Sequence, residues 1–552
     1  MTARISIRPC LNQAYLLGLM MVAVGLTLSP FMMGMSQFWL ALVWLVDAIT
    51  PNRHCGLDPQ SPGRGFKAKL SRFWHNKAAV LLVAFYLMHV VGLLWTSDFP
   101  YALKDLRVKL PILVMPFVLS SMEPLDRKRF NLVMLVYVLS VFIATQVSFV
   151  SYMRHDYGDI REISHFISHI RFCLNIVFGM AVVGYYLVKM RVSRGEGVPA
   201  FGVKVVVNQF LMWFLLFWFA YQIYIFESLS GYVTLAAVAI VSVVYAFLRW
   251  QQGRGWRIAI AAVALAVVVV GCLFVWHEVK PLLKVEPVDF TTLEKKTAQG
   301  NDYWHDTVHN PVEDGRYVGL YYCRKELQET WLQRSAMPLN DTVEPTLARY
   351  LTSKGFRKDA QGVMALTDED IRNIELGVAN YNNWQHPGLR ARLSSTLFEY
   401  GLYRKYNNPN GGSLSQRIEF TRASFHLIAQ HPWFGVGTGD VPQAFSQAYD
   451  EIHSPLAEEY RFRAHNQYLA IAVAFGLVGL AFFFFVLLYP WLASRKNHTY
   501  LFTVFLTIML ISMFPEDTLE TQAGAMLFAF FMALLLFASP KTDPDPKPSL
   551  RA

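Results

Sequence analysis

The richest group of residues that could do chemistry lies between positions 413 and 480. The stretch SLSQRIEFTRASFHLIAQHPWFGVGTGD (413–440) is followed by RFRAHNQYLAIAVAFGLVGL (461–480), which leads directly into an apolar run. His465 would lie where that run meets water, and a neutral imidazole there is suited to accept a proton. Arg417 carries a guanidinium, which can bind a phosphate group bidentately without losing its own proton. The simpler alternatives are an interfacial histidine at a helix start and an arginine on a solvated helix face.

Two further segments place cations beside apolar runs. The segment WTSDFPYALKDLRVKLP (95–111) brings four charged residues to the entrance of a span, namely Lys104, Asp105, Arg107 and Lys109. In REISHFISHIRFCL (161–174), Arg171 enters an apolar stretch, where an unpaired charge is costly and therefore a functional candidate. Snorkelling of Arg171 to the interface is an equally weighted alternative.

Carboxylates gather in one short segment near the C-terminal end, PEDTLETQAG (515–524). It carries Glu516, Asp517 and Glu520 and would lie on the same face of the membrane as His465. Such a carboxylate could orient a substrate or pair with an arginine. A solvated turn is the favoured interpretation, because short polar connections usually run over the surface.

The elements that must position these residues are membrane spans. The chain has 552 residues, of which 54% are hydrophobic and only 16% charged, against roughly 25% charged residues in a soluble domain. Because about 20 apolar helical residues cross a bilayer, the apolar runs predict an all-α polytopic membrane protein. Its twelve transmembrane helices are expected near 12–29, 34–50, 78–95, 109–122, 130–151, 171–189, 206–226, 231–248, 258–276, 467–489, 499–514 and 522–538.

The distribution of Lys and Arg predicts the orientation. These residues concentrate in the loops that lie inside if the N-terminus is inside, so both termini are expected in the cytoplasm. The net charge of +10 is then mainly a topology signal and gives no support to nucleic-acid binding. The predicted organisation is a nine-span region (1–277), one large periplasmic loop domain (278–464), a three-span region (465–540) and a cytoplasmic tail (541–552).

Local signals predict that the large loop is folded and mainly helical. Thr367 and Asp370 have the spacing of a capping box. A helix is also expected after residue 413, on an apolar stripe formed by Leu414, Ile418, Phe425 and Ile428. Pro432 and the glycines at 435, 437 and 439 predict a turn that lets the loop approach the membrane.

Several enzyme classes are excluded by absent motifs. The chain has no G-x-x-x-x-G-K-[ST], H-E-x-x-H or G-x-S-x-G string, so nucleotide-driven transport, zinc proteolysis and serine hydrolysis lack support. The five cysteines are scattered and form no C-x-x-C pair, which argues against a zinc site. No metal and no cofactor are expected.

Taken together, Arg417, HPWFGVGTGD (431–440) and HNQYL (465–469), with Gly476 and Gly479 in the following span, resemble the O-antigen ligase and O-antigen polymerase family. The resemblance implies transfer of a glycan from undecaprenyl pyrophosphate to an acceptor such as the lipid A core, at the periplasmic face of the bacterial inner membrane. His465 would then be the base and Arg417 the pyrophosphate ligand, with Arg422 and Arg463 as alternatives. The further cations that could hold the pyrophosphate are Lys109, Arg107 and Arg171.

One departure from the family pattern affects the phosphate site. Many members carry Ser-Arg-x-Gly at the entrance of a middle span, whereas here Leu229 stands in the arginine's place in ESLSGYV. Arg171 is the best-placed replacement by sequence. A polymerase or a protein O-oligosaccharyltransferase would use the same chemistry with another acceptor, and the single late loop favours the ligase. A transporter is less favoured because the charges gather at span ends rather than at mid-depth.

Overall fold

The computed structural model is almost entirely helical. It describes residues 7–50, 65–154, 157, 159–192, 199–200, 203–204, 209–249 and 254–540. Within these residues the strands form only two short hairpins, β1–β2 (Pro199–Ala200, Val203–Lys204) and β3–β4 (Val312–Glu313, Arg316–Tyr317). The architecture agrees with the predicted all-α class, and the predicted tail (541–552) lies outside the described residues.

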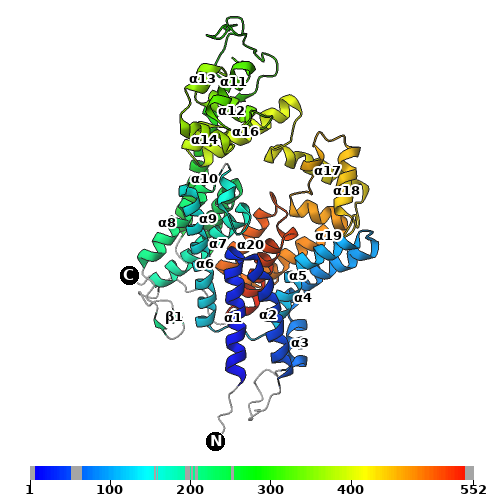
Figure 1. Cartoon of the computed structure of the whole chain (residues 1–552). Coiled ribbons are helices and arrows are strands. Elements are labelled where there is room, and N and C mark those ends of the chain that lie inside the picture. The colour runs from blue at the N-terminus through cyan, green and yellow to red at the C-terminus, as the bar shows by residue number, and fades with distance from the viewer. Residues whose placement is uncertain are drawn as a thin grey trace, which may run out of the picture.

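Each of the twelve predicted spans overlaps one helix of the structure (Figure 1). These helices are α1 (Ile7–Leu28), α2 (Pro30–Ile49), α4 (Lys77–Val91), α5 (Phe99–Ser121), α6 (Arg127–Arg154), α7 (His169–Val192), α8 (Gln209–Ile225), α9 (Leu229–Arg249), α10 (Arg254–Leu282), α19 (Gln467–Leu492), α20 (Tyr500–Ser512) and α21 (Gln522–Ala533). Seven helical stretches, namely α1, α2, α4 with its 3-10 extension, α6, α7, α9 and α19, are long and apolar enough to cross a membrane; α8, α20 and α21 are shorter apolar helices. The chain is thus a helical membrane protein, and the count of twelve crossings stays a prediction.

Helix α5 begins about ten residues before the span that the sequence predicts at 109–122. Asp98 caps its first turn by accepting a hydrogen bond from the Tyr101 amide at 2.9 Å, and Pro100 occupies the first turn, where proline is tolerated. Two further prolines, Pro111 and Pro116, lie inside the helix without ending it. Helix α5 therefore extends beyond the predicted span, and the charged residues 104–109, which were expected in the preceding loop, lie on a helix.

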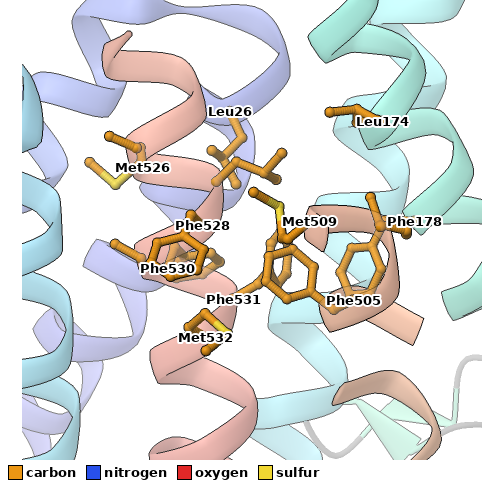
Figure 2. Close-up of a cluster of buried hydrophobic side chains, with 14 of the residues drawn as sticks. Leu26, Leu174, Phe178, Phe505, Met509, Met526, Phe528, Phe530, Phe531 and Met532 are labelled. Atoms are coloured by element: carbon orange, nitrogen blue, oxygen red, sulfur yellow. The ribbon is translucent and has the colours of Figure 1, made fainter. Parts of the chain in front are cut away.

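The packed centre of the membrane part is α21. Every residue from Gly524 to Leu535 is buried, and the helix packs against α5 and α20. Figure 2 shows Phe528, Phe530 and Phe531 of this helix among side chains of α1, α7 and α20. An apolar helix without a polar face is stable only when protein or lipid surrounds it. Because α21 is enclosed by protein, it fixes the turn that precedes it.

Residues 283–466 form a separate helical segment, which we call the head. Its helices are α11 (Arg324–Arg334), α12 (Val343–Ser353), α13 (Ala360–Met364), α14 (Asp368–Glu375), α15 (Tyr381–Gln385), α16 (Leu389–Tyr406), α17 (Ser413–Gln430) and α18 (Val441–Glu451). Helices α11–α14 lie at the top of Figure 1 around their own core, centred on Trp331, Leu347 and Tyr350. The predicted capping box is present, since Thr367 and Asp370 bond reciprocally at the start of α14.

The predicted turn after α17 is held against a break in α19. Gly476 has φ 65° and interrupts the helical conformation. Around this break, the Val436 and Gly437 amides donate to the Val473 and Ala474 carbonyls at 2.9 Å, and the Leu477 amide donates to the Pro432 carbonyl at 2.8 Å. The break leaves backbone amides and carbonyls of α19 without helical partners. Residues 432–437 supply the hydrogen bonds that such buried groups need.

The same loop is also bonded to the connection between α4 and α5. The Asp440 carboxylate accepts hydrogen bonds from the Ser97 amide (2.9 Å) and the Asp98 amide (2.8 Å). Thr438 donates its hydroxyl to the His89 carbonyl at 2.7 Å. These bonds hold the lower part of the head in a fixed position over α4, α5 and α19.

We expect Gly476→Ala to destabilise this clamp. A Cβ at position 476 would lie 2.2 Å from the Trp433 carbonyl carbon, and the backbone conformation there is nearly restricted to glycine. The loss should be at least about 2–3 kcal/mol, from conformational strain alone, and should appear as a lower thermal midpoint of the detergent-purified protein. Gly184→Ala in α7 is the matched control, because a Cβ there meets nothing within 4 Å. Equal midpoints for the two variants would contradict the clamp.

Candidate active site

The site is built around the turn between α20 and α21, which carries Glu516, Asp517 and Glu520. The first two residues are only 7% and 4% exposed, so this turn is buried rather than solvated. Gln467, the first residue of α19, holds it: its side-chain oxygen accepts from the Leu519 amide at 2.6 Å, and its amide donates to the Met513 carbonyl at 2.9 Å. Buried carboxylates need partners. Cations from other segments therefore pair with the carboxylates of this turn.

His465 lies beside Asp517, immediately before α19. Asn466 caps that helix by accepting from the Leu469 amide at 3.0 Å, and His465 adopts a left-handed conformation with φ 43°. Its Nδ1 atom lies 3.9 Å from Asp517 Oδ1, and the Phe420 ring of α17 stacks on the imidazole at 5.3 Å. With Nδ1 facing the carboxylate, Nε2 is the nitrogen available for proton transfer.

Two arginines share Glu516. Arg417 of α17 places Nη2 3.1 Å from one carboxylate oxygen, and its Nε donates to the Pro515 carbonyl at 3.2 Å. Arg171 of α7 places Nη2 3.7 Å from the other oxygen, and its Nε is buried without a partner. Two guanidinium groups facing one carboxylate leave an excess positive charge, which favours an anionic ligand.

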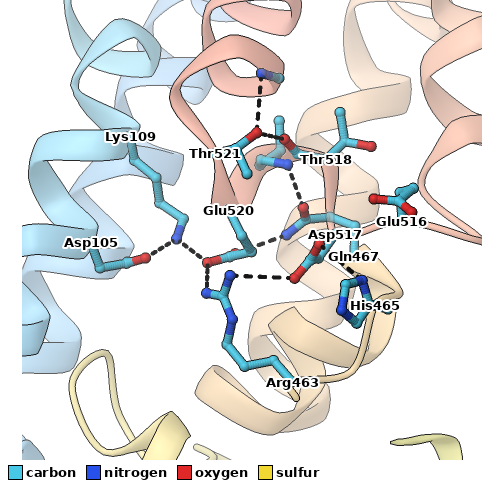
Figure 3. Close-up of polar contacts among 12 residues, drawn as sticks. Asp105, Lys109, Arg463, His465, Gln467, Glu516, Asp517, Thr518, Glu520 and Thr521 are labelled. Atoms are coloured by element: carbon cyan, nitrogen blue, oxygen red, sulfur yellow. Dashed lines mark hydrogen bonds and ion pairs between the residues drawn. The ribbon is translucent and has the colours of Figure 1, made fainter. Parts of the chain in front are cut away.

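Arg463 joins a second ion-pair group beside the first. Figure 3 shows the chain of contacts: Lys109 Nζ bonds both Asp105 and Glu520, and Arg463 bonds Glu520 at 3.2 Å and faces Asp517 at 3.5 Å. Burial alone would raise the pKa of Glu520, but Lys109 and Arg463 outweigh it and hold that pKa well below its usual value. Glu520 is therefore a permanent anion that anchors both cations.

A pocket of about 520 Å³ is lined by several of these residues, whereas Arg417, Glu516 and Lys109 lie beside it. Charged side chains form its wall together with aromatic ones. The charged and histidine members are Lys104, Asp105, Arg171, Arg461, Arg463, His465, Asp517 and Glu520. A polar cleft with a possible base and several cations is suited to a reaction on an anionic substrate.

Residues 377–484 match the family model described as O-Antigen ligase. This match supports assignment of the chain to the O-antigen ligase family. It confirms the resemblance predicted from the motif residues and indicates a membrane enzyme of the glycosyltransferase type. No curated protein matches the chain.

The O-antigen ligase match covers only one side of the pocket. It includes Arg417, Arg463 and His465, whereas Arg171 and the carboxylate turn lie outside residues 377–484. The wall of the pocket is thus completed by α5, α7 and the α20–α21 turn, which the motif residues alone do not reveal.

The structure brings together some of the predicted site residues and separates others. His465, Arg463 and Arg171 line the pocket, and Arg417 touches Glu516 beside it. Arg422 instead pairs with Glu419 at 2.7 Å, and neither it nor Arg107 is among the residues that line the pocket. Arg107 is exposed because it lies two residues from Asp105 and from Lys109, on another face of α5.

Lys109 is near the pocket but differs from the predicted phosphate ligand. It is 1% exposed and held between Asp105 and Glu520, so its charge is already used within the protein. The sequence analysis did not single out Tyr101 and Gln467, which bond Arg463 and Glu520. The i,i+4 spacing of Asp105 and Lys109 is the one local signal that predicts part of this group.

His465, Glu516 and Asp517 also meet a geometric requirement for metal binding, because their ligand atoms lie within 4.8 Å of one another. However, Arg417 and Arg171 face Glu516, and Arg463 faces Asp517. A divalent cation at this position would be repelled by three guanidinium groups. Both carboxylates are thus already paired with arginines, and a metal ion would have to displace these ion pairs.

We expect Lys109→Met to destabilise the protein strongly. The substitution leaves Asp105 and Glu520 buried without their shared cation, and removal of one partner from a buried ion pair typically costs about 3–5 kcal/mol. The thermal midpoint in detergent should fall accordingly. Arg107→Met, on the exposed face of the same helix, should change stability by less than about 0.5 kcal/mol. Similar midpoints for both variants would refute the anchoring role of Lys109.

Proposed function

We propose that the protein transfers a glycan from undecaprenyl pyrophosphate to an acceptor hydroxyl on the lipid A core or a similar lipid, at the periplasmic face of the bacterial inner membrane. The observation that carries this proposal is the placement of His465, next to Asp517, within one pocket that also contains Arg171 and Arg463. The family match to O-antigen ligases supports the reaction class. The charge arrangement suits a diphosphate leaving group.

In the proposed reaction, the acceptor oxygen attacks the anomeric carbon of the donor sugar. His465 Nε2 takes the hydroxyl proton as the new C–O bond forms. The bond between the anomeric carbon and the pyrophosphate oxygen breaks, and the leaving group departs with the electron pair. Asp517 stabilises the imidazolium that results, since its carboxylate faces Nδ1.

Arg417 and Arg171 would hold the departing pyrophosphate. Both already converge on Glu516, which positions them but neutralises only one of their two charges. A guanidinium stays protonated throughout and can bind phosphate oxygens bidentately. In this scheme Arg171 replaces the arginine that many family members carry where this chain has Leu229.

We expect His465→Ala to lower the transfer rate by about 10²–10⁴-fold, the usual contribution of a general base. Arg417→Ala should lower it by about 10–100-fold through loss of charge-assisted hydrogen bonds. In a deletion strain, neither inserted variant should restore long-chain surface glycan, and carrier-linked glycan should accumulate. Rates are measured in membranes with equal amounts of inserted protein.

The matched controls are His386→Ala and Arg390→Ala. Both residues are exposed, lie in the head and take no part in lining the pocket. They should restore wild-type glycan. Full restoration by His465→Ala and Arg417→Ala would overturn the proposal. Accumulation of unpolymerised repeat units instead of finished carrier-linked chains would identify the enzyme as a polymerase.

Transfer should also proceed without a divalent metal. The arginines around Glu516 and Asp517 disfavour a bound cation, and the proposed leaving group is stabilised by guanidinium groups. We therefore expect the transfer rate of the purified enzyme in excess EDTA to stay within about twofold of the untreated rate, well under 1 kcal/mol in activation free energy. Loss of activity that Mg²⁺ or Mn²⁺ restores would contradict this prediction.

A further inference from the structure

A second pocket, of about 480 Å³, lies between the head and the membrane helices. One wall comes from the segment after α6 and from the α8–α9 turn, with Arg161 and Glu227. The other wall comes from the head, with Trp384 of α15 and with Arg392 and Glu399 of α16. Nothing in the proposed transfer step uses these residues. The pocket combines charged and aromatic side chains, as ligand-binding sites do.

Arg392 differs from the other arginines of this pocket. Arg161 is bound by Asp159 through two nitrogens, and Arg349 is bound by Glu313 at 2.7–2.8 Å. Arg392 donates to Ser413 Oγ at 3.0 Å, and among the described residues no carboxylate lies within 4 Å of it. A half-buried guanidinium without a carboxylate is costly unless an anion binds it.

The electrostatic surroundings point the same way. Burial lowers the pKa of Arg392, and this effect together with the nearby charges of Arg161 and Arg417 outweighs the opposing effects of Glu399 and Asp159. Burial also raises the pKa of Glu227 to about 7, so this carboxyl is an incomplete counter-charge at neutral pH. Arg392 therefore has its counter-charges, Glu399 and the partly ionised Glu227, only at a distance, and its guanidinium can bind an anion directly.

The remaining wall suits a sugar ring. Trp384 and Tyr157 lie with ring centroids 5.2 Å apart, and such aromatic faces cover the apolar faces of ligands. Amide side chains lie beside them, including Asn383. An amide both donates and accepts hydrogen bonds, as a saccharide hydroxyl does.

Ser413 links Arg392 of the second pocket to Arg417, which lies beside the candidate active site. Ser413 accepts from Arg392 through its hydroxyl at 3.0 Å and from Arg417 through its carbonyl at 3.4 Å. Its own amide donates to Glu399 at 2.8 Å. A saccharide bound near Arg417 could therefore extend across Ser413 to Arg392.

We propose that this pocket is a subsite for an acidic saccharide, whose carboxylate or phosphate binds Arg392 and whose ring packs against Trp384, which Tyr157 supports from behind. The proposal rests on the proposed function, because it assigns the pocket to the glycan or the acceptor of the same transfer. It adds a selectivity for anionic sugars that the transfer chemistry itself does not require.

The test measures binding of two probes to the full-length protein in detergent: trigalacturonic acid, which is anionic, and maltotriose, which is neutral. Trigalacturonic acid should bind at least about fivefold more tightly than maltotriose. Arg392→Gln should weaken its binding by about tenfold or more, the effect of losing a charged hydrogen bond. Arg392→Lys, which keeps the charge but loses the planar fork, should give an intermediate affinity.

Arg390→Gln is the matched control, since Arg390 lies on the same helix, is exposed and does not line the pocket. It should bind trigalacturonic acid like the wild type. Each variant must elute as a single peak in size-exclusion chromatography and have a wild-type thermal midpoint. If Arg392→Gln fails this check, the affinity of Arg392→Lys for trigalacturonic acid is the test. Equal binding of both probes, no effect of replacing Arg392, or an equal loss in Arg390→Gln would overturn the proposal.

A transfer assay separates this proposal from the proposed function and identifies the source of the saccharide. His465→Ala should bind trigalacturonic acid normally while losing transfer; normal transfer by that variant would refute the proposed function alone. Inhibition of wild-type transfer by trigalacturonic acid should be competitive against the lipid-linked donor if the pocket holds the glycan, or against the acceptor if it holds the acceptor. Binding without any inhibition would overturn the subsite.

Discussion

The need to neutralise three carboxylates on one buried turn organises the site. Glu516, Asp517 and Glu520 are fixed because α21 is enclosed by protein and cannot shift toward water. An ionised carboxylate in such surroundings requires cations within a few ångströms. The cations come from α5, α7, α17 and the segment before α19, four parts of the chain that are separated in sequence. Ion pairs with this one turn thus join these four segments, and no local sequence pattern predicts that they meet.

The clamp at Gly476 supplies the second constraint, which is mechanical rather than electrostatic. A helix that breaks inside the membrane part must satisfy its freed backbone groups, and the 432–437 loop does so. Asp440 then ties the end of that loop to α5, the helix that carries Asp105 and Lys109. The position of α17, and with it Arg417, is consequently fixed relative to His465 from both sides. The proposed pair, Arg417 on α17 and His465 just before α19, needs such rigidity.

Much of the fold is predictable from local pattern, because apolar length and capping residues act over a few turns. The helices and the capping box at Thr367 belong to this class. His465 and Arg417 could be proposed from the sequence because both belong to the motif strings between residues 413 and 480, and their roles stay predictions. The role of Glu516 could not be proposed in this way, since its partners lie far away in the chain and a short acidic segment looks like a solvated turn. Arg107 does not line the pocket for a different reason. Because α5 already starts at Phe99, residues 107 and 109 lie on one helix, and side chains two positions apart along a helix point in different directions.

The division of the arginines between two pockets has a functional consequence. Arg417 and Arg171 face a shared carboxylate beside the proposed base, whereas Arg392 faces the second pocket, and Ser413 contacts both Arg392 and Arg417. If the first group holds the diphosphate and the second the saccharide, the chemistry common to all donors is separated from the features that distinguish them. Substitutions around Arg392 could then change which glycan is accepted without altering proton transfer at His465. Because Arg392 and Arg417 both bond Ser413 at the start of α17, a saccharide held by one lies at a defined position relative to a diphosphate held by the other, and such positioning favours attack at the anomeric carbon.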